Sequence, residues 1–429
     1  MPARERDAGS LTGAFRSLRH RNYRLYFFGQ LVSLTGTWMQ TAALMWLAFE
    51  VTHQSKWPAL LTAAGWIPTF LLGAWGGTLA DRRPKRTLLL MSQSALMIRA
   101  LVLAGLVFSG VVTRWYLLVI ALANGLVQVV DFPARLTIVM DMVGRDDLIN
   151  AVGLNSMLFN VTRAIGPAVA GWLLITLGPG LCFLINGLSY AAVVWALAQM
   201  NVGLSPAIHR SGSSKSLLAG LNYLAERPGL AALISLAGIL ALCAWPFLAL
   251  LPALASGRIA AAEQGYTQML SSFGFGALAA ALIVASFGSL ARHREFLLVG
   301  VTIISAGLFG LSLVASLYVA AGLCAAIGFG LALFFTTCQA IVQLSAGDHN
   351  RGIIMGLWAM VLSGALPAGL LIGGPAADYW GVSLVLRAEG MACTGVAVAL
   401  LLLFTIWKSN GDGHPERGAT GGLGGAPAA

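Results

Sequence analysis

Long hydrophobic stretches fill most of the chain and alternate with short polar connections. A helix needs about 20 consecutive apolar residues to cross a bilayer, and twelve stretches are long enough. Backbone groups in lipid must be paired within the spanning segment, which favours helices, and the alternating pattern of barrel strands is absent. The predicted helical spans are 24–49, 58–80, 87–110, 114–140, 149–177, 179–200, 229–253, 266–291, 295–317, 318–344, 352–378 and 383–407.

The composition agrees with this pattern, because 58% of the residues are hydrophobic and only 10% are charged. Soluble domains are nearer 45–50% apolar and about 25% charged. A secreted domain, a cytosolic enzyme and a nucleic-acid-binding protein are therefore poor interpretations. The net charge of +10 does not indicate a nucleic-acid partner, since the basic residues are spread over short connections. We expect an all-α integral membrane protein with the lipid bilayer as its surroundings.

The distribution of Lys and Arg predicts the orientation. Most of these residues lie in the N-terminal segment and in every second connection, whereas the other connections hold only Lys56, Arg114, Arg258 and Arg387. Basic residues concentrate on the cytoplasmic side of membrane proteins, so both termini are predicted to be cytoplasmic. The N-terminal segment 1–23 lacks a hydrophobic core followed by a cleavage site, and we do not expect it to be a signal peptide.

The longest internal connection, 201–228, separates six spans from six. We predict an N-terminal six-helix bundle at 24–200, a C-terminal bundle at 229–407 and a disordered Gly- and Ala-rich tail at 408–429. One constant shift along the chain relates glycines at matching topological positions in the two halves. A duplicated six-span unit is typical of secondary transporters, whose substrate sites lie between the halves. The related glycines are Gly144, Gly153, Gly166 and Gly171 in the first half and Gly347, Gly356, Gly369 and Gly374 in the second.

Polar residues recur on single faces of three spans in the first half. Asn124, Gln128, Asp131 and Arg135 share one face of the fourth span. A charge in mid-membrane costs about 2.5–3.5 kcal/mol, so this face should meet water or partner groups rather than lipid. We expect substrate-facing positions here and on the first and fifth spans, at Gln30, Ser33, Thr37, Gln40, Asn155 and Asn160.

Asp131 is the acid that we place well inside a span, which makes it the leading candidate for a proton carrier. Arg135 lies one turn away, and Arg163 of the fifth span is a second candidate partner. Burial would favour the protonated acid, whereas a neighbouring arginine would favour the ionised form. The alternative is a static Asp131–Arg135 pair that braces a helix bent at Pro133.

The second half contributes mainly aromatic and amide side chains to its spans, and our substrate-facing candidates there are Trp245, Phe334, Gln339 and Trp358. They would give the site one aromatic wall opposite one polar wall. Such a site suits a bulky amphipathic molecule better than a sugar, whose hydroxyls each need a partner. The alternative is that these residues face lipid or pack between helices.

Motifs for enzymatic or ATP-driven chemistry are missing from the sequence. There is no Walker loop, HExxH, GxSxG or CxxC pair. We therefore expect no enzymatic activity, no metal and no cofactor, and a proton gradient as the energy source.

The segment GGTLADRRPKR at 76–86 resembles the signature loop of the major facilitator superfamily, with Pro84 in place of its second glycine. The resemblance implies that Asp81 contacts the eleventh span and helps to close the cytoplasmic side. The alternative is that the basic residues only orient the chain. The loop residues that match are Gly77, Asp81, Arg82, Lys85 and Arg86. Gly166, Pro167 and Gly171 partly resemble the hinge signature of the superfamily's antiporters, although Thr162 and Ala170 depart from it.

Residues 14–407 as a whole resemble the branch that contains the enterobactin exporter, whose members are called transmembrane secretion effectors. The resemblance implies the major facilitator fold and a monomer in a bacterial inner membrane. It also implies proton-driven export of a small molecule, such as a siderophore or drug, by alternating access. A lipid or lysophospholipid translocator, or an uncoupled facilitator, is the alternative. The resemblance rests on FRSLRHRNYRLYFFGQLVSLTGTWM, GGTLADRRPKR, DFPARLTIVMDMVGRDDLINAVGLNSM and KSLLAGLNYLAERPGL.

Overall fold

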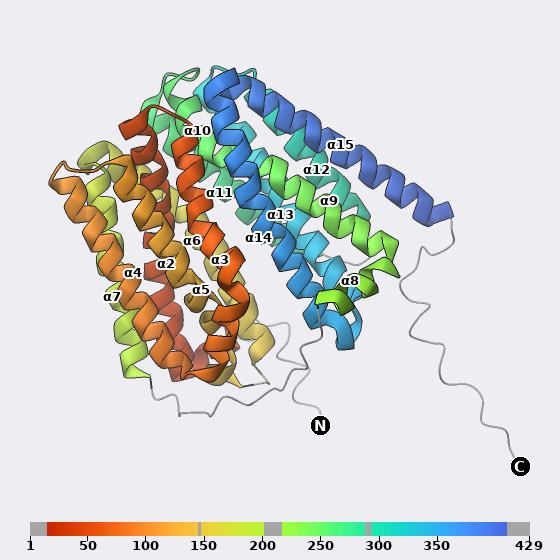
Figure 1. Cartoon of the computed structure of the whole chain (residues 1–429), viewed down its shortest axis with the longest axis horizontal. Coiled ribbons are helices and arrows are strands. Elements are labelled where there is room, and N and C mark those ends of the chain that lie inside the picture. Colours follow the sequence, from red (N-terminus) through yellow and green to blue (C-terminus); the bar gives the residue numbers. More distant parts are fainter. Residues whose placement is uncertain (1–14, 145–146, 201–216, 288–292, 410–429) are drawn as a thin grey trace, which may run out of the picture.

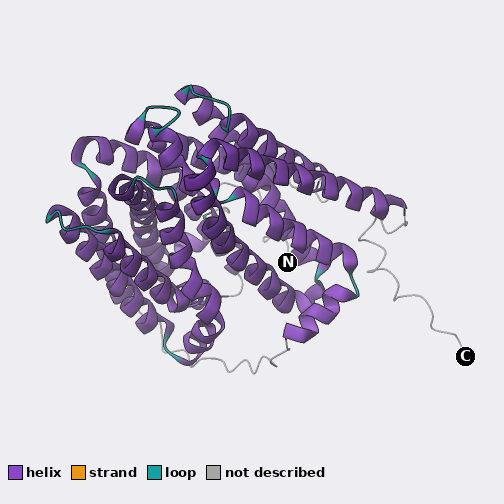
Figure 2. Cartoon of the chain, turned by 45° about the horizontal axis from the view of Figure 1, so that its top comes forward, coloured by secondary structure: helices purple, strands orange, loops and turns teal. Residues whose placement is uncertain are grey.

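The computed structural model describes residues 15–144, 147–200, 217–287 and 293–409. Every regular element in these ranges is a helix (Figure 2). The elements are η1 (Arg16–Arg19), α2 (Arg21–Thr52), α3 (Lys56–Arg82), α4 (Lys85–Phe108), α5 (Arg114–Val143), α6 (Leu148–Leu177), α7 (Pro179–Gln199), α8 (Leu217–Ala225), α9 (Pro228–Ala244), α10 (Phe247–Ser256), α11 (Ala262–Phe287), α12 (His293–Leu311), α13 (Leu317–Ser345), α14 (Gly347–Trp380) and α15 (Val382–Ser409).

One predicted helix differs from the structure. The stretch 229–253 is not one helix, because α9 ends at Ala244 and α10 begins at Phe247. Pro246 lies between them and has no amide hydrogen to donate to the preceding turn. The described part of the predicted linker 201–228 contains α8, which packs on α14 through Gly220.

The outer surface of the helices is suited to lipid. Within the described residues, ten helical spans are long and apolar enough to cross a membrane, and α9 with α10 counts as one of them. Large hydrophobic side chains are exposed in mid-helix, with Leu71 67% and Trp172 65% exposed. Water would disfavour this surface, and hydrocarbon accepts it. The prediction of an all-helical integral membrane protein is confirmed.

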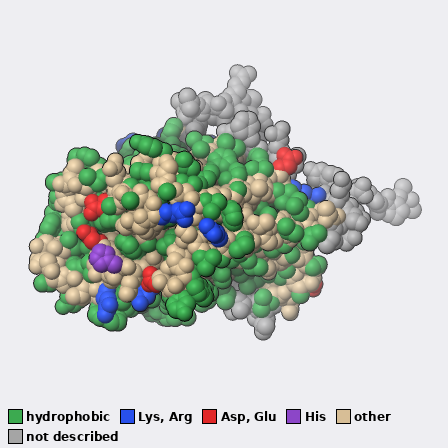
Figure 3. Space-filling view, turned by 90° about the horizontal axis from the view of Figure 1, so that it is seen from above, with side chains coloured by type: hydrophobic (Ala, Val, Ile, Leu, Met, Phe, Trp, Pro, Cys, Tyr) green, Lys and Arg blue, Asp and Glu red, His purple; other side chains and the backbone are tan. Residues whose placement is uncertain are grey.

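Aromatic residues mark one end of the helices. Arg114 lies over the rings of Trp57 and Trp115, at 5.4 and 5.6 Å from their centroids, and Tyr379 and Trp380 are exposed at the end of α14. Tryptophan and tyrosine favour the membrane–water boundary. We call this the α2–α3 end, after the connection that lies there, and the opposite end the η1 end. Seen from the α2–α3 end, charged side chains are scattered among hydrophobic and other groups (Figure 3).

The helices form two groups, which we call the N-terminal group (α2–α7) and the C-terminal group (α9–α15). Contacts between the groups are made chiefly by α3 with α14 and by α6 with α11. The groups meet towards the α2–α3 end and diverge towards the η1 end (Figure 1).

Glycines related by the sequence shift occupy equivalent contacts. Gly166 lets α6 approach α2 at Trp38, and Gly369 lets α14 approach the α9–α10 break at Pro246. Gly171 meets Thr267 of α11, and Gly374 meets the start of α3. The first pair thus packs helices within a group, and the second pair packs helices between groups.

The η1 end carries a polar contact outside the spans. The Nε2 atom of His20 lies 2.7 Å from Oδ2 of Asp147, and Arg16 pairs with Oδ1. The hydrogen bond from His20 and then the Arg16 contacts hold the pKa of Asp147 below its ordinary value, partly opposed by burial. Because the folded-state pKa is lowered, this contact stabilises the fold above the ordinary carboxyl pKa. The contribution is lost as the pH falls through the lowered value.

Helix packing gives a stability prediction at Gly276. A Cβ there would clash with the backbone carbonyl of Ala325, whereas a Cβ at Gly322 meets nothing within 4 Å. We expect Gly276→Ala to lower the thermal transition of the purified protein by several degrees, because close α11–α13 packing must open. Gly322→Ala is the matched control and should be neutral or slightly stabilising. Fluorescence-detected size-exclusion after heating measures both, and equal transitions would contradict the prediction.

Candidate functional site

A small cavity lies between the two groups, above the point where they diverge. Its volume is about 60 Å³, far below the roughly 300–1,000 Å³ of sites for drug-sized ligands. In this conformation the cavity is therefore too small to hold such a ligand. The lining residues are Trp38, Thr41, Ala42 and Met45 of α2, Arg163 and Pro167 of α6, Trp245 and Leu248 at the α9–α10 break, and Leu270 and Phe273 of α11.

The surface of the cavity is almost entirely apolar and aromatic, although its lining residues Trp38, Thr41 and Arg163 carry hydrogen-bond donors. Trp245 and Phe273 meet edge to face with centroids 6.4 Å apart. The guanidinium of Arg163 lies 6.0 Å from the ring of Phe159, which in turn packs on Trp38. Nε1 of Trp38 is buried and has no hydrogen-bond partner among the described residues. The lining contains no acid. Such a wall suits the apolar part of an amphipathic molecule, and the Arg163 side chain places one cation beside it.

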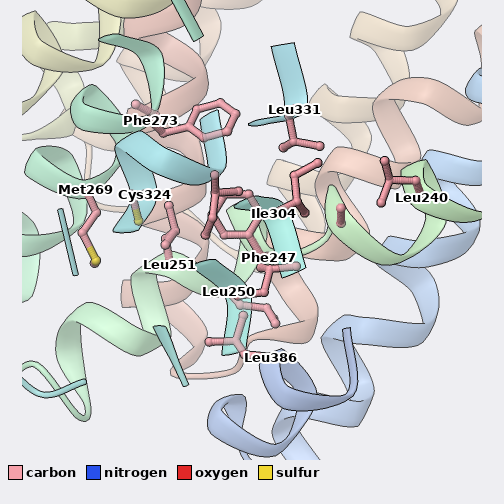
Figure 4. Close-up of a cluster of buried hydrophobic side chains, with 14 of the residues drawn as sticks. Leu240, Phe247, Leu250, Leu251, Met269, Phe273, Ile304, Cys324, Leu331 and Leu386 are labelled. Atoms are coloured by element: carbon pink, nitrogen blue, oxygen red, sulfur yellow. The ribbon is translucent and has the colours of Figure 1, made fainter. Parts of the chain in front are cut away.

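Behind Trp245, the helix break is held by a buried hydrophobic cluster. Phe247, the first residue of α10, packs on Phe273 with centroids 5.7 Å apart. Figure 4 shows both rings together with Leu250 and with Leu386 of α15. The cluster links the cavity wall to the interior of the C-terminal group.

The polar residues predicted to face substrate on α2 lie on a different face from the cavity lining. Gln30 accepts a hydrogen bond from Arg135 at 3.0 Å, and Thr37 lies 3.1 Å from the hydroxyl of Tyr190 in α7. Ser33 is buried on the same side. Helix packing explains this placement, because polar side chains pair with one another inside the N-terminal group. Their contact with substrate stays a prediction.

Gln40 belongs to a similar buried set. Its amide lies 2.6 Å from Nδ2 of Asn186 and, with its oxygen turned towards Arg99, 2.7 and 2.9 Å from the two terminal nitrogens of that guanidinium. Arg99, on the third predicted span, thus contacts the Gln40 amide, and its described contacts include no acid.

Asp131 is fully buried and accepts three hydrogen bonds. Ser92 and Gln93 of α4 donate to Oδ1 at 2.6 and 2.7 Å, and Arg135 donates to Oδ2 at 2.5 Å. Three donors and no acceptor suit an ionised carboxylate. The structure therefore brings Asp131 and Arg135 together. Arg163 does not join this pair. It lies beside Trp38, which is eight residues, or about 12 Å along the axis of α2, from the Arg135 partner Gln30.

Gln93 is a site residue that the sequence analysis missed. Its Oε1 atom is buried with no partner among the described residues. A protonated Asp131 would need an acceptor, and rotation of this amide would present one. The available signal was the polar pair Ser92-Gln93 within an otherwise apolar span.

The remaining polar candidates of the first half lie apart from the cavity lining. Asn124 lies near Gly65 of α3, and Asn155 accepts a hydrogen bond from Tyr23 at 3.2 Å. Gln128 is half-buried. The side chain of Asn160 lies outside the described residues.

The signature loop is only partly described. Lys85 donates to Asp141 of α5 at 2.8 Å, and Arg86 donates to the carbonyls of Leu197 and Ala198 of α7 at 2.7 and 2.8 Å. These contacts join helices within the N-terminal group. A Cβ at Gly77 meets nothing within 4 Å, and the side chains of Asp81 and Arg82 lie outside the described residues.

The aromatic candidates of the second half form a chain of rings. Trp245 contacts Phe335, which contacts both Phe334 and Trp358. Phe334 is fully buried against Gly300 of α12, so it packs within the group, and only Trp245 lines the cavity. Gln339 is exposed.

Polar contacts close the α2–α3 end of the cavity. The Ser55 and Lys56 amides at the start of α3 donate to the two carboxylate oxygens of Asp378 in α14, at 2.5 and 3.2 Å. Trp46 of α2 donates to Glu263 of α11 at 3.1 Å. Each of these bonds crosses between the groups, so they must break before this end can open.

We expect Asp378→Ala to shift the protein towards a form that is open at the α2–α3 end. Two hydrogen bonds to a charged group are lost, and each contributes about 1.5–3 kcal/mol, so we expect the population to shift by more than about ten-fold. Double electron–electron resonance between spin labels at positions 110 and 316 measures the distance between the N-terminal and C-terminal groups. Asp378→Glu is the conservative control, and an unchanged distance distribution in Asp378→Ala would refute the role.

These features define a class. A helical membrane protein with two packed groups, a cavity between them and one closed end is typical of solute transporters. The sequence profile of the transmembrane secretion effectors matches residues 12–416, and the chain belongs to this family of the major facilitator superfamily. The predicted family is confirmed.

Three relatives illustrate the family. The staphyloferrin A transporter of Staphylococcus aureus is 22% identical, with 84% of this chain and 90% of that protein aligned. The multidrug efflux pump Tap of Mycolicibacterium fortuitum is 24% identical, with 88% and 92% aligned. The enterobactin exporter EntS of Shigella boydii is 25% identical, with 90% and 92% aligned.

A solved structure shares the fold at low sequence identity. A bacterial homologue of the human lysosomal transporter Spinster, in an inward-facing and unoccupied conformation, aligns with a TM-score of 0.69 at 14% identity. The alignment covers 91% of this chain and 98% of the other. The family and these relatives are membrane transporters of small molecules.

Proposed function

We propose that this protein exports a bulky, amphipathic, anionic small molecule in exchange for protons. The observation that carries the proposal is the cavity between the groups, where Arg163 and the Trp38 indole lie in an aromatic wall. The efflux and siderophore-transport names of the relatives support export. We further propose twelve spans, with α2 and α3 included, cytoplasmic termini and location in a bacterial inner membrane.

In this scheme the η1 end faces the cytoplasm, and the structure corresponds to the form that loads cargo. The cargo enters where the groups diverge and reaches Arg163 and Trp245. Closure of the η1 end and rupture of the Asp378 and Glu263 contacts then expose the cargo to the other side. Rocking of two repeats around a fixed site is the usual mechanism of such folds.

The proton step is assigned to Asp131. In the cytoplasm-facing form the carboxylate accepts three hydrogen bonds, which suits the state after proton release. Protonation in the outward-facing form would weaken the pair with Arg135, turn the Gln93 amide and loosen α5 from α4. Asp131 lies away from the cavity lining, so the coupling passes through helix packing rather than through contact with cargo.

The energy is sufficient for accumulation. One charge crossing 100 mV is worth about 2.3 kcal/mol, and each ten-fold gradient costs about 1.4 kcal/mol. One proton per cycle therefore supports roughly a fifty-fold gradient of a neutral cargo. Export of a monoanion from a negative interior adds a similar amount.

Proton flux in inside-out vesicles tests the proposal. Energised vesicles that contain the protein should release protons when an amphipathic anion, such as a catecholate siderophore, is added. Neutral dyes and macrolides of similar size serve as comparison cargo. Folded protein that moves no protons with any compound, but moves a fluorescent lysophospholipid, would replace the proposal with lipid translocation.

A further inference from the structure

The C-terminal group contains a buried acid that the sequence analysis did not single out, although it falls within the predicted span 383–407. Glu389 of α15 is 8% exposed, and its Oε2 atom has no hydrogen-bond partner among the described residues. It lies seven residues after the start of the helix at Val382, or about 10 Å from the α2–α3 end. Asp131 is therefore not the only acid inside the predicted spans.

The surroundings of Glu389 offer no counter-ion in the described structure. The titratable groups that interact with Glu389 are Cys243 of α9 and Cys393 of α15. The nearest arginine along α15, Arg387, donates to Ser312 of α12 at 3.3 Å. Of the two acids of α14, Asp378 is bound to backbone amides of α3, and Asp348 belongs to the first turn of the helix, at the η1 end. The α10 helix has no titratable residue, and those of α12 lie at its start near the η1 end: His293, Arg294 and Glu295.

The carboxyl group also lies beside the break between α9 and α10. A Cβ on Gly373 of α14 would be 3.5 Å from Oε1 of Glu389 and 3.3 Å from Cβ of Pro246. The Glu389 carboxyl group and the Pro246 ring therefore both pack against α14 at Gly373, where there is no side chain. The residue before Pro246 is Trp245, which lines the cavity.

We propose that Glu389 is a second proton-binding site. The α9–α10 break stays packed while Glu389 is protonated and loosens when Glu389 releases its proton. An ionised carboxylate in an apolar site without a counter-ion costs several kcal/mol, whereas the neutral acid can remain. Ionisation must therefore be relieved by water entry or movement, and the break beside Pro246 is the neighbouring weak point of the helix. The cavity wall at Trp245 then reports the proton state of Glu389.

Infrared spectroscopy of the full chain in lipid nanodiscs tests the site. The C=O stretch of a protonated carboxylic acid is separate from carboxylate bands. Wild type at neutral pH should show such a band, Glu389→Gln should lose it, and Asp131→Asn should retain it. A wild-type spectrum identical to that of Glu389→Gln would overturn the proposal. Glu389→Asp keeps the acid and should show a shifted band. This variant replaces Glu389→Gln in the test if the glutamine variant does not fold.

The link to the break needs a second readout. The difference in tryptophan fluorescence between wild type and Trp245→Phe isolates the signal of Trp245. This signal should change over the same pH range as the infrared band and stay constant in Glu389→Gln. A Trp245 signal that changes with pH identically in Glu389→Gln would overturn the coupling. These measurements use neither cargo nor a gradient, so their result is independent of whether the protein exports anions.

Discussion

Replacing Asp131 with asparagine should remove the roughly fifty-fold share of cargo accumulation that one proton supplies at 100 mV. The cargo then reaches only its own electrochemical equilibrium, while downhill exchange persists. Asparagine keeps the shape of the side chain and an oxygen for Arg135, but it cannot carry a proton. The cargo site at Arg163 and Trp245 is remote from this change. The measurement is the steady-state ratio of cargo across inside-out vesicles with an imposed proton gradient, alongside counterflow without one.

Ser92→Ala is the matched control for Asp131→Asn. It removes one of the three donors to the carboxylate but leaves the acid in place, so coupling should persist with an altered pH dependence. If Asp131→Asn still accumulates cargo as wild type does, Asp131 is a static partner of Arg135 and the coupling proton binds elsewhere. Loss of both exchange and accumulation in a folded variant would show that the Asp131–Arg135 pair braces the helices.

The spans were predictable because lipid imposes a simple rule on the sequence. Backbone groups must be paired and side chains must be apolar over about 20 residues, so hydropathy alone located helices such as α5 and α13. The break at Pro246 was readable in principle, since proline interrupts helix hydrogen bonding. It was missed because the hydrophobicity of 229–253 is continuous across it.

The direction in which polar side chains point was harder to predict. Gln30 and Gln40 lie in a helix that also carries Trp38 and Thr41, and periodicity cannot tell which face meets the cavity. The structure shows that Gln30 and Gln40 contact buried polar side chains of α5 and α7. These partners are distant in sequence, so no local pattern predicts the pairing.

The burial of acidic side chains was also hard to predict from the sequence. Asp131 stood out because Arg135 follows one helical turn later, whereas Glu389 sits near the end of a hydrophobic stretch where a charge often reaches water. Only the packing of α9 and α14 on α15 shows that this carboxyl is enclosed. Glycine positions were more informative, because Gly166 and Gly369 mark equivalent close helix contacts in the two halves.

Replacing Arg163 with glutamine should weaken binding of an anionic amphipathic cargo by about 10- to 100-fold, because a hydrogen bond to a charged group contributes about 1.5–3 kcal/mol. The guanidinium of Arg163 belongs to the cavity lining, so an anionic group of a cargo bound there meets a positive charge. Binding of a neutral amide of the same compound should change little. Tryptophan quenching by a catecholate siderophore and by its neutral analogue measures both affinities on purified protein.

Two further variants separate charge from shape at this site. Arg163→Lys keeps the positive charge and should retain part of the preference for the anion, although it loses the forked geometry of the guanidinium. Trp38→Phe keeps the ring that packs on Phe159 and removes the buried N–H donor, so it should weaken the anion and the amide alike. Equal losses for both probes in Arg163→Gln would indicate that Arg163 supports the packing of α6 on α2, and that the cargo is chosen by the aromatic wall.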